Sequence, residues 1–565
     1  MSTENARRVF GIDLGTTYSA LAFVDEHGKA QIIPNSDNEN ITPSVVFFEE
    51  GTGNVIVGSV ARESARTDPQ RVVTFVKRHM GEAGWVFSLD GKDYSPERVS
   101  SLILKRLADN AQTFGHDVKD VVITCPAYFK DAERNATRTA GQMAGLNVLD
   151  IIDEPVAAAY NYSLGNADNV GKTAIVYDLG GGTFDVTVIR VTQSNDGGIT
   201  VESVWTLGDH KLGGKNWDDR LVDYLIREYQ QLNPGKGDDI RTDRETMFEL
   251  QVTAENVKKT LSKRETAMAS VTHAGERTRV DVTRKIFDEI TSDLLEQTVT
   301  FTRDLIEQVK KEKGIARFDD FLLVGGSTRM PQVMEMVKRE FQPLLGVEPR
   351  EHDVDQAVAQ GAALHGNILH TKKAVEDTIQ VIRNKTGNEG KTDAEIKDEA
   401  FGLIADETGQ SVEEVVQAVN TRVITVASGS YGLRAVRKSD NAAVINNLIF
   451  RQTPLPASAQ KFYGVDTDKA ANIEIIIFVN DSRESAADLD SGSEVGRGTL
   501  KLEAGRTKDD KVEVTFTLNP DGTLSVKAVD RKSGNDVKLD IKAATSVSEE
   551  EIAQAQAENA SLTIE

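Results

Sequence analysis

Apolar and polar residues alternate differently in different parts of this chain. From residue 8 to about residue 370, short apolar runs typical of buried strands alternate with amphipathic segments. The clearest such segment, residues 95–111, starts with a capping serine and a proline, and its apolar residues recur every three or four positions from Val99 to Leu107. A longer helical pattern covers residues 285–312. Strands that alternate with helices predict an α/β fold.

The pattern changes after residue 370. Residues 372–384 and 393–420 are polar with helical periodicity, and a capping box of Ser411 and Glu414 lies in the second segment. We expect this stretch to fold as a small helical hairpin or bundle.

Residues from about 422 onward predict an all-β domain. The strand-like runs on either side of Pro520–Asp521–Gly522 predict a hairpin. The last residues start a helix that we expect to last one or two turns. The predicted organisation is an α/β domain (1–371), a helical insertion and linker (372–421), a β-sandwich (422–547) and a short C-terminal helical stub (548–565).

Two segments of the α/β part, residues 8–24 and 173–189, share one plan. Each has an apolar strand, then Asp-Leu-Gly, a turn of small residues and a second apolar strand. The aspartates of the two copies, Asp13 and Asp178, align with each other. The repeat predicts two lobes that are built from the same hairpin-led unit.

Glycine and aspartate are unfavourable in strands, so the two turns need an explanation. One explanation is structural, namely tight hairpin turns with aspartate as the turn former. The other is a phosphate site, because Gly15 and the glycines at 180–182 leave backbone N–H groups open to phosphate oxygens. Asp13 and Asp178 would then act through Mg²⁺ and its waters. The matched pair of acids favours the phosphate site.

The composition narrows the classes of function. The 565 residues are too many for one hydrophobic core, and a formal net charge of −23 argues against binding nucleic acid or an anionic membrane. The only cysteine, Cys125, cannot form a disulfide within the chain and is expected to be a small core residue. No signal-peptide core and no apolar run of about 20 residues is present. We expect a cytoplasmic protein that does not enter a membrane.

Four motifs, in this order, resemble the signatures of the 70-kDa heat-shock (Hsp70) chaperones of the actin/hexokinase ATPase superfamily. They are "GIDLGTTYSALA", "IIDEPVAAAYNY", "DLGGGTFDV" and "LLVGGSTRMPQV". The resemblance covers residues 8–370 continuously and 428–552 more loosely. It implies a duplicated, two-lobed actin-like ATPase domain followed by a β-sandwich that binds peptides.

The resemblance also implies roles for individual residues. The implied catalytic residues are Lys77, Glu154, Asp178, Thr183 and Asp185. Asp13 and Asp178 would hold Mg²⁺ through water, with K⁺ as an optional further ion. ATP or ADP would be bound by Gly15, Thr16, Thr17, Tyr18, Gly180, Gly181, Gly182, Glu255, Lys258, Lys259, Ser262, Gly325, Gly326, Ser327, Arg329 and Asp355. Pro126 and Arg134 would relay the nucleotide state to the peptide-binding domain.

Two positions of the nucleotide site are distinctive. Asp185 has no acidic counterpart in the first copy, where Ala20 or Leu21 falls, so the resemblance puts the water-handling carboxylates on the second lobe. Lys259 stands where the family usually has an arginine, and a lysine stacks less well on adenine. Because Arg329 remains, we expect weaker nucleotide binding and not its loss.

The C-terminal half resembles the peptide-binding domain of the family. The residues that would line its groove for an extended apolar peptide are Leu433, Val436, Phe462, Val465 and Ile473. Such a groove would combine main-chain hydrogen bonds with side-chain pockets. The alternative for each residue is an ordinary place in the core of the sandwich.

Three departures from the family concern the coupling of the two halves. The linker segment, residues 420–436, lacks the usual aspartates and proline, extra residues intervene between roughly 373 and 420, and the helical lid stops early. The altered linker puts allosteric coupling in doubt, and a missing lid should raise the rate of peptide release.

The leading hypothesis is an Hsp70-like chaperone that couples ATP hydrolysis to the binding and release of extended apolar polypeptide segments. Its implied partners are unfolded polypeptides, a J-domain co-chaperone and a nucleotide-exchange factor. The alternative is a nucleotide-binding regulator or exchange factor with weak or uncoupled ATPase activity. A small-molecule kinase or a filament-forming protein of the same superfamily is disfavoured, because neither needs the β-domain.

Overall fold

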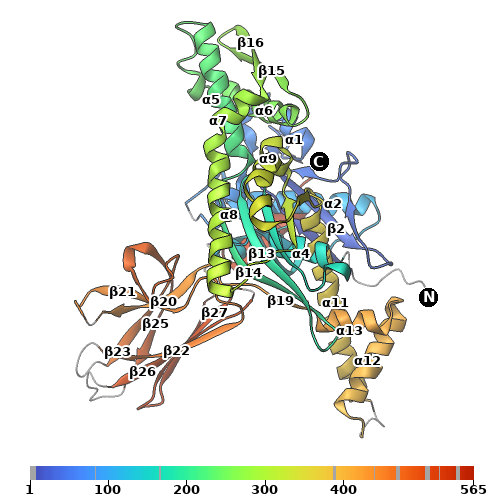
Figure 1. Ribbon diagram of the computed structural model, residues 1–565, viewed down its shortest axis with the longest axis vertical. Coiled ribbons are helices and arrows are strands. Elements are labelled where there is room, and N and C mark those ends of the chain that lie inside the picture. The colour runs from blue at the N-terminus through green and yellow to red at the C-terminus, as the bar shows by residue number, and fades with distance from the viewer. Residues whose placement is uncertain are drawn as a thin grey trace.

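Two six-stranded sheets form the centre of the first part of the molecule (Figure 1). The computed structural model describes residues 8–82, 84–164, 167–385, 390–437, 439–465, 471–502, 510–520, 522–541 and 547–564. The order of the first sheet is β11 (Asn147–Asp153), β10 (Asp120–Cys125), β1 (Val9–Asp13), β2 (Tyr18–Val24) and β3 (Ala30–Ile33), with β4 (Thr42–Pro43) also paired to β2. The order of the second is β18 (Pro349–Glu351), β17 (Asp320–Val324), β12 (Thr173–Leu179), β13 (Phe184–Gln193), β14 (Ile199–Asp209) and β19 (Arg422–Ile424). We call the parts built on these sheets the first and the second lobe.

The two sheets repeat one topology, which confirms the predicted repeat. In each lobe the first hairpin strand pairs antiparallel with the second and parallel with a later strand, β1 with β2 and β10, and β12 with β13 and β17. Asp13 is paired with Ala20 across the first hairpin, and Asp178 with Asp185 across the second. Ala20 is therefore the counterpart of Asp185.

The inner strands are continuous apolar runs because both of their faces are covered. Every residue of β10 is buried, and so is every residue of β12 after Thr173. Cys125 ends β10 as a fully buried residue, and burial raises the pKa of its thiol to about 12. It is the small core residue that we expected.

The two lobes also contain helices, of which only some lie on the two six-stranded sheets. The helices are α1 (Ser59–Ser64), α2 (Pro96–Thr113), α3 (Asp131–Met143), α4 (Glu154–Leu164), α5 (Gly214–Leu232), α6 (Arg244–Leu261), α7 (Arg284–Ile290), α8 (Ser292–Lys313), α9 (Pro331–Glu340), α10 (Gln342–Leu345) and α11 (Ala357–Arg383). Ser95 caps α2 as predicted. The single helix predicted over 285–312 is wrong, because Thr291 (φ −115°) interrupts it and its hydroxyl donates to the carbonyl of Phe287. No helix in the described ranges is long and apolar enough to cross a membrane.

Three small sheets complete the two lobes. They consist of β5 (Val46–Phe48), β6 (Val55–Val57) and β7 (Val72–Val73), of β8 (Phe87–Leu89) and β9 (Lys92–Tyr94), and of β15 (Thr266–His273) and β16 (Glu276–Thr283).

The predicted helical insertion is a bundle with its own core. Its helices are the end of α11, α12 (Asp393–Thr408) and α13 (Val412–Asn420), which lie together away from the sandwich in Figure 1. Capping boxes start α12 at Thr392 and α13 at Ser411. The buried residues shared by the three helices are Val375, Ile382, Ile396, Ala400, Phe401, Ile404, Ala405 and Val415. The predicted boundary at residue 371 falls inside α11, which continues without a break to Arg383.

The all-β part consists of two packed sheets. One has the order β24 (Ala486–Asp488), β21 (Ala443–Ile449), β20 (Ser430–Val436), β23 (Asn472–Asn480) and β25 (Gly492–Lys501), and the other has β22 (Ala457–Gly464), β26 (Lys511–Leu518), β27 (Leu524–Asp530) and β28 (Asp536–Ile541). Apolar residues of both sheets form one core. The predicted hairpin is confirmed as β26 and β27, which pair from Leu518 and Leu524 onward, while Asp521 in its turn lies outside the described residues.

The sandwich is hydrogen-bonded to both lobes. In the first lobe, the hydroxyl of Tyr431 on β20 donates to the carboxylate of Asp131 at the start of α3, 3.1 Å from each oxygen. In the second lobe, the side-chain amide of Gln452 pairs with the backbone of Thr206 on β14. The Thr206 N–H donates to Oε1 (3.1 Å), and Nε2 donates to the Thr206 carbonyl (2.7 Å).

The C-terminal helix α14 (Glu549–Ser561) packs against the first lobe, and the C-terminal end lies there in Figure 1. It has 13 residues, so the prediction of one or two turns is wrong. A capping box at Ser548 starts the helix, and contacts with α2 and α3 support its length. Beyond it, Ile564 is buried in the core of the first lobe and forms a bridge to Val55 of β6.

Replacing Asn559 with alanine should destabilise this contact. The side chain of Asn559 is fully buried, and its Nδ2 donates to Ser101 Oγ (2.9 Å) and to the Met143 carbonyl (2.8 Å). Losing the donor leaves buried acceptors unpaired, at a cost of about 1–3 kcal/mol. Hydrogen exchange of α14 should become faster than in the matched Gln554→Ala variant, whose side chain is exposed. Equal exchange in the two variants would contradict the prediction.

Candidate functional site

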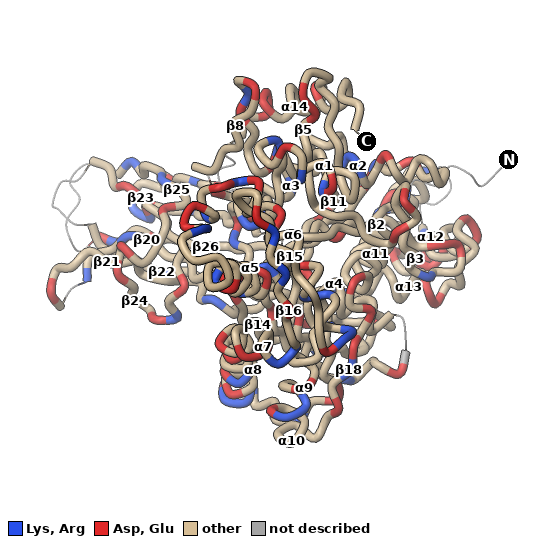
Figure 2. The backbone as a smooth tube through the Cα atoms, turned by 90° about the horizontal axis from the view of Figure 1, so that it is seen from above, with Lys and Arg blue, Asp and Glu red and all other residues tan. Residues whose placement is uncertain are grey.

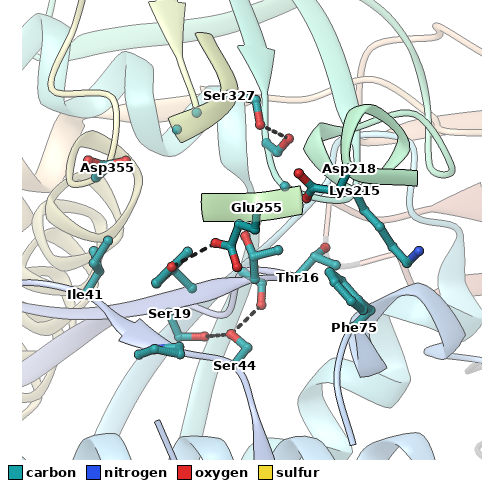
Figure 3. Close-up of a pocket in the computed structure, with 18 of the residues that line it drawn as sticks. Thr16, Ser19, Ile41, Ser44, Phe75, Lys215, Asp218, Glu255, Ser327 and Asp355 are labelled. Atoms are coloured by element: carbon teal, nitrogen blue, oxygen red, sulfur yellow. Dashed lines mark hydrogen bonds between the residues drawn. The ribbon is translucent and has the colours of Figure 1, made fainter. Parts of the chain in front are cut away.

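A cavity of about 790 Å³ lies between the two lobes. Figure 3 shows residues from both lobes around it, with Ser44 and Phe75 from the first lobe opposite Asp218 and Ser327 from the second. The structure brings together on its wall all of the residues predicted for nucleotide, Mg²⁺ and catalysis except Gly182 and Asp185. These residues come from segments as far apart in the sequence as Asp13 and Asp355.

The glycine turns of the two hairpins meet at the wall of this cavity. A Cβ atom added to Gly181 would lie 2.1 Å from Oγ1 of Thr17, and one added to Gly182 would lie 2.4 Å from Cγ2 of Thr16. No real Cβ tolerates such distances, so these positions need glycine for the close approach of the two turns. The threonines of the first copy are thus packed directly on the glycines of the second.

The carbonyl groups of the second turn are all bound by the second lobe or by Arg78. Because N–H and C=O point in opposite directions in a trans peptide, the amide groups of Gly181, Gly182 and Thr183 point away from these donors. The turn therefore offers a run of backbone N–H groups, which suits an anion. The donors are Gly214 N–H (3.0 Å) and Ser327 Oγ (2.9 Å) to Gly180, Lys215 N–H (2.7 Å) to Gly181, and Arg78 Nη2 (2.7 Å) to Gly182.

The first turn is held by Ser44. Its hydroxyl donates to the carbonyl of Gly15 (2.8 Å) and its N–H donates to the carbonyl of Thr17 (2.9 Å). Figure 3 shows Ser44 beside Ser19, with their hydroxyls 2.9 Å apart. The turn is thus fixed before any ligand binds.

Carboxylates gather at the bottom of the cavity around one lysine. Nζ of Lys77, from the 3₁₀ helix Val76–His79, lies 2.5 Å from Oε1 of Glu154 at the start of α4, and both side chains are buried. Burial acts to lower the pKa of Lys77, but the charges of Glu154 and Asp13 outweigh it and raise this pKa. Lys77 is therefore a fixed positive charge.

Asp13, the last residue of β1, and Asp178, the last but one of β12, both interact electrostatically with this lysine. Burial, together with the negative charge of Glu154, raises the pKa of Asp13 to about 7. Burial also raises the pKa of Asp178 well above its ordinary value, and Glu154 and Asp13 add to the rise. One lysine thus faces three carboxyl groups, an arrangement that a divalent cation would relieve. No cluster of three or more acidic, histidine or cysteine side chains among the described residues is placed to hold a metal directly. Two carboxyl groups that act through water, Asp13 and Asp178, still fit Mg²⁺, which binds few carboxylates and keeps its waters.

The raised pKa of Asp13 should make the stability of the folded chain depend on pH. In the folded chain without Mg²⁺ this carboxyl keeps its proton up to about pH 7, whereas its ordinary pKa is 3.8. The folded state then binds more protons than the unfolded state, so stability falls as the pH rises from about 4 to 7. The Asp13→Asn variant cannot lose stability in this way. Its melting temperature should therefore rise relative to that of the parent as the pH increases from about 4 to 7, and Mg²⁺ should make this difference smaller. Parallel curves for the two proteins would contradict the raised pKa.

Asp185 lies behind the cavity wall and does not line it. Its side chain is 1% exposed, and its Oδ1 has no hydrogen-bond partner among the described residues. Burial and the charges of Glu154 and Asp178 raise its pKa well above the ordinary value. Its predicted role in positioning the attacking water stays a proposal.

The phenol of Tyr18 reaches across the cavity mouth. Its hydroxyl donates to Glu255 of α6 (3.0 Å) and accepts from Arg62 (2.9 Å) and Lys259 (2.6 Å). Lys259, which replaces the usual arginine, pairs with Glu255 (2.7 Å) and lies 4.9 Å from the Tyr18 ring centroid. The hydrogen bonds of Tyr18 to Glu255 and Lys259 join the two lobes.

Two further ion pairs complete the wall on the second lobe. Lys258 contacts Asp218 (2.7 Å), and Arg329 pairs with Asp355. Gly325 has a φ of +83°, and a Cβ there would lie 2.3 Å from Oδ1 of Asp178, which explains the glycine. The sequence patterns did not point to several further wall or turn residues, because these lie outside the four motifs. They are Ser44, Arg62, Phe75, Arg78, Lys215 and Asp218.

The predicted relay residues lie between the cavity and the sandwich. Arg134 on α3 pairs with Asp153, the neighbour of Glu154, and its Nε donates to the carbonyl of Phe129 (3.0 Å). Pro126 follows β10 directly and is buried. One turn from Arg134, Asp131 accepts from the sandwich residue Tyr431.

The structure does not bring the five predicted groove residues to one surface. Leu433 and Val465 are buried in the sandwich core, and Ile473 packs against it. Val436 (48% exposed) and Phe462 (51% exposed) lie on β20 and β22, which belong to different sheets. Because both alternate with core-facing residues, they point outward on opposite sides of the sandwich.

Comparison with known proteins identifies the family. The family model described as "Hsp70 protein" matches residues 9–85, 83–382 and 417–564, which is more than half of the chain. The chain belongs to the Hsp70 family. This Hsp70 is 32% identical to the chaperone protein DnaK of Halobacterium salinarum over 561 residues, which cover 98% of this chain and 77% of the relative. It is 33% identical to the chaperone protein DnaK of Thermotoga petrophila over 560 residues, covering 97% and 83%.

The resemblance seen in the motifs is thereby confirmed, and this chain is an Hsp70-like molecular chaperone. Nucleotide binding and ATPase activity are general properties of the family. The mixed α/β sheets, the helical region and the β-domain described above agree with such a protein. The match of the family model leaves out residues 383–416, which include all of α12.

Proposed function

We propose that this Hsp70 binds and hydrolyses ATP with Mg²⁺ in the cavity between its lobes, and that this reaction drives the binding and release of extended apolar polypeptides. The observation that carries the proposal is the pair of glycine turns, which face each other above a cluster of three carboxyl groups and one buried lysine. Phosphoryl transfer needs backbone N–H groups, cationic charge and carboxylates that can hold Mg²⁺ through its waters.

Each group would have a distinct part in the reaction. The turns at Thr16 and Gly181 would position the phosphates, and Lys77 would place a fixed positive charge beside them. Glu154 would orient the attacking water, and Asp178 would accept a proton at its carboxylate. Bound Mg²⁺ would neutralise phosphate charge, held through water by Asp13 and Asp178. Because the transition state is loose, such positioning and charge supply most of the catalysis.

The adenosine would lie toward α6 and the second lobe. Glu255, Lys258 and Ser262 line the cavity from α6 and its end, and Arg329 lines it beside Asp355. Lys259 is engaged with Glu255 and Tyr18, which supports weaker stacking on adenine than an arginine would give.

We propose the sandwich as the site of polypeptide binding, with Val436 and Phe462 as its exposed apolar residues among those predicted. The partners would be unfolded or extended polypeptides, a J-domain co-chaperone and a nucleotide-exchange factor. The protein would act in the cytoplasm and would bind neither nucleic acid nor a membrane.

Single-turnover hydrolysis of Mg²⁺-ATP, with and without an extended apolar peptide, tests the proposal. Slow hydrolysis that the peptide accelerates would support a coupled chaperone. A rate of hydrolysis that the peptide does not change would show that the two halves are uncoupled. Tight nucleotide binding with no hydrolysis would point to the regulator, and the proposed reaction would be wrong.

A further inference from the structure

Strand β6 is the outer strand of the small first-lobe sheet whose order is β6, β5 and β7. The residue before β6, Asn54, faces β5, because its carbonyl accepts from the N–H of Glu49, which follows β5 (3.1 Å). Successive residues of a strand turn their N–H and C=O groups to opposite edges, so the N–H of Val55 points away from β5. An edge of this kind can bind a further strand.

A segment from the other end of the chain lies on this edge. After α14, Leu562 has an extended backbone (φ −79°, ψ 136°), and we call residues 562–564 the tail segment. The N–H of Val55 donates to the carbonyl of Thr563 (3.2 Å), and Val55 and Ile564 form a parallel bridge. The tail segment is therefore added to the sheet beside β6.

The side chains of the tail segment alternate as those of a strand do. Ile564 is 8% exposed and belongs to the buried core of the first lobe, together with Val55 and Val57 of β6. Leu562 packs against the same core, and Thr563 between them is exposed. The edge therefore suits an apolar–polar–apolar sequence with one covered, branched aliphatic side chain.

An arginine of α2 holds the main chain of the tail segment. Nη1 of Arg106 donates to the carbonyl of Ile564 (3.0 Å), and its Nη2 donates to Oγ of Ser36 (3.1 Å). A hydrogen bond from a guanidinium is stronger than one from a neutral donor. The contact uses the backbone of Ile564 and not its side chain, so another segment of the same pattern could receive it.

These contacts are separate from those that hold α14. The helix is attached through Asn559, which donates to Ser101, and through the ion pair of Glu558 with Arg98 (2.9 Å). Neither β6 nor Arg106 lines the cavity between the lobes. The edge of β6 is therefore distinct from the nucleotide cavity, from the sandwich and from the seat of α14.

We propose that the edge of β6 is a binding site for an extended segment of the pattern apolar–polar–apolar, and that the tail segment occupies it as a built-in ligand. Recognition combines the N–H of Val55, the guanidinium of Arg106 and burial of one aliphatic side chain, which is how sheet edges bind peptides. While the tail segment is bound, the edge is closed to other strands. The site is independent of the proposed function, since it involves neither nucleotide nor the sandwich.

Hydrogen exchange at the amide of Val55 in the full-length chain shows whether the site is occupied. Ile564→Asp puts a charge into the apolar core and should release the tail segment, so that this amide exchanges about tenfold faster or more. Ile564→Ala should give a smaller increase. Thr563→Asp is the matched control and should exchange like the parent, because this side chain is exposed and the bond to Val55 uses the carbonyl.

A peptide with the sequence of residues 558–565 shows whether the edge binds a separate segment. It is added at about 1 mM, the effective concentration of a segment on a short tether. In the Ile564→Asp chain the peptide should slow exchange of Val55 by about threefold or more, and in the parent, whose site is filled, it should change nothing. The same peptide carrying Ile564→Asp should have no effect, and Arg106→Ala added to the Ile564→Asp chain should remove most of the effect.

Two results would overturn the proposal. Equal exchange of Val55 in the parent and in both Ile564 variants would show that the tail segment does not occupy the edge. Fast exchange in Ile564→Asp that the peptide leaves unchanged would show a tethered contact without a binding site. The amide of Ile123 in β10 should keep its exchange rate throughout. If Ile564→Asp also speeds exchange there, the core of the first lobe has opened, and the same peptide measurement on Ile564→Ala decides.

Discussion

Replacement of Lys77 with alanine is expected to slow single-turnover ATP hydrolysis by about 100-fold or more. Lys77 is the cation that contacts Glu154, and it lies at the bottom of the cavity among the carboxyl groups of Asp13 and Asp178. Without its charge, these acids would repel both one another and the phosphates. The buried lysine therefore contributes charge that solvent cannot replace.

The measurement separates chemistry from binding and from folding. Lys310→Ala, on the exposed last turn of α8, is the matched control and should hydrolyse ATP like the parent. Lys77→Met keeps most of the side-chain volume and should be equally inactive, with a melting temperature that shows whether the chain folds. Hydrolysis within about threefold of the parent in a folded Lys77→Met chain would contradict the role of the lysine charge.

Gly181→Ala is expected to weaken nucleotide binding by about 10- to 100-fold, because overpacking of this kind costs about 1–3 kcal/mol. The added Cβ would meet Oγ1, Cγ2 and Cβ of Thr17, all within 3 Å. Rotation of Thr17 cannot remove a clash with its own Cβ, so the two turns must separate. The backbone N–H groups of the second turn would then move away from the first turn.

Titration with a fluorescent nucleotide analogue measures this effect. Gly402→Ala is the control, since Gly402 lies inside α12 where an added Cβ would meet no neighbouring atom within 4 Å, and its replacement should leave the affinity unchanged. Affinity in Gly181→Ala equal to that of the parent would show that the facing turns do not clamp the nucleotide.

Much of the nucleotide cavity could be predicted from the sequence because its signals are local. An aspartate, a glycine turn and two apolar strands lie within seventeen residues in each copy, residues 8–24 and 173–189, and the structure pairs them as hairpins. The capped starts of α2 and α13 were predictable for the same reason, since a cap and its partner are three residues apart. Over residues 285–312 the prediction depended on the periodicity of apolar residues alone, and it missed the break between α7 and α8 at Thr291.

Other parts of the site depend on residues that are distant in the sequence. The hydroxyl of Tyr18 meets Glu255 across the cavity mouth, and Arg78 reaches the carbonyl of Gly182. The sequence also does not tell which apolar strand residues of the sandwich are buried. Leu433 is buried in the core, whereas Phe462 is exposed. Burial depends on which face of which sheet a residue occupies, and that is decided when the sheets pack.

The charged residues show that the composition of the chain does not determine where charges gather in the folded structure. The chain is acidic overall, and acidic and basic residues are spread over most elements in Figure 2, with acids along α12. The net charge predicted the absence of a nucleic-acid surface, but it did not predict that carboxyl groups would gather around Lys77. Their raised pKa values arise from burial and mutual repulsion, which only the folded chain creates.

The sequence by itself determined the order of the elements, the repeated phosphate turns, the family and the existence of a helical insertion, because each depends on neighbours along the chain. The tertiary structure alone decided three further features. It brought Gly181 within contact of Thr17, placed α14 on the first lobe, and joined the insertion to β19 and β14. The physical reason is that these contacts join surfaces from distant segments, and their complementarity exists only when both segments are folded.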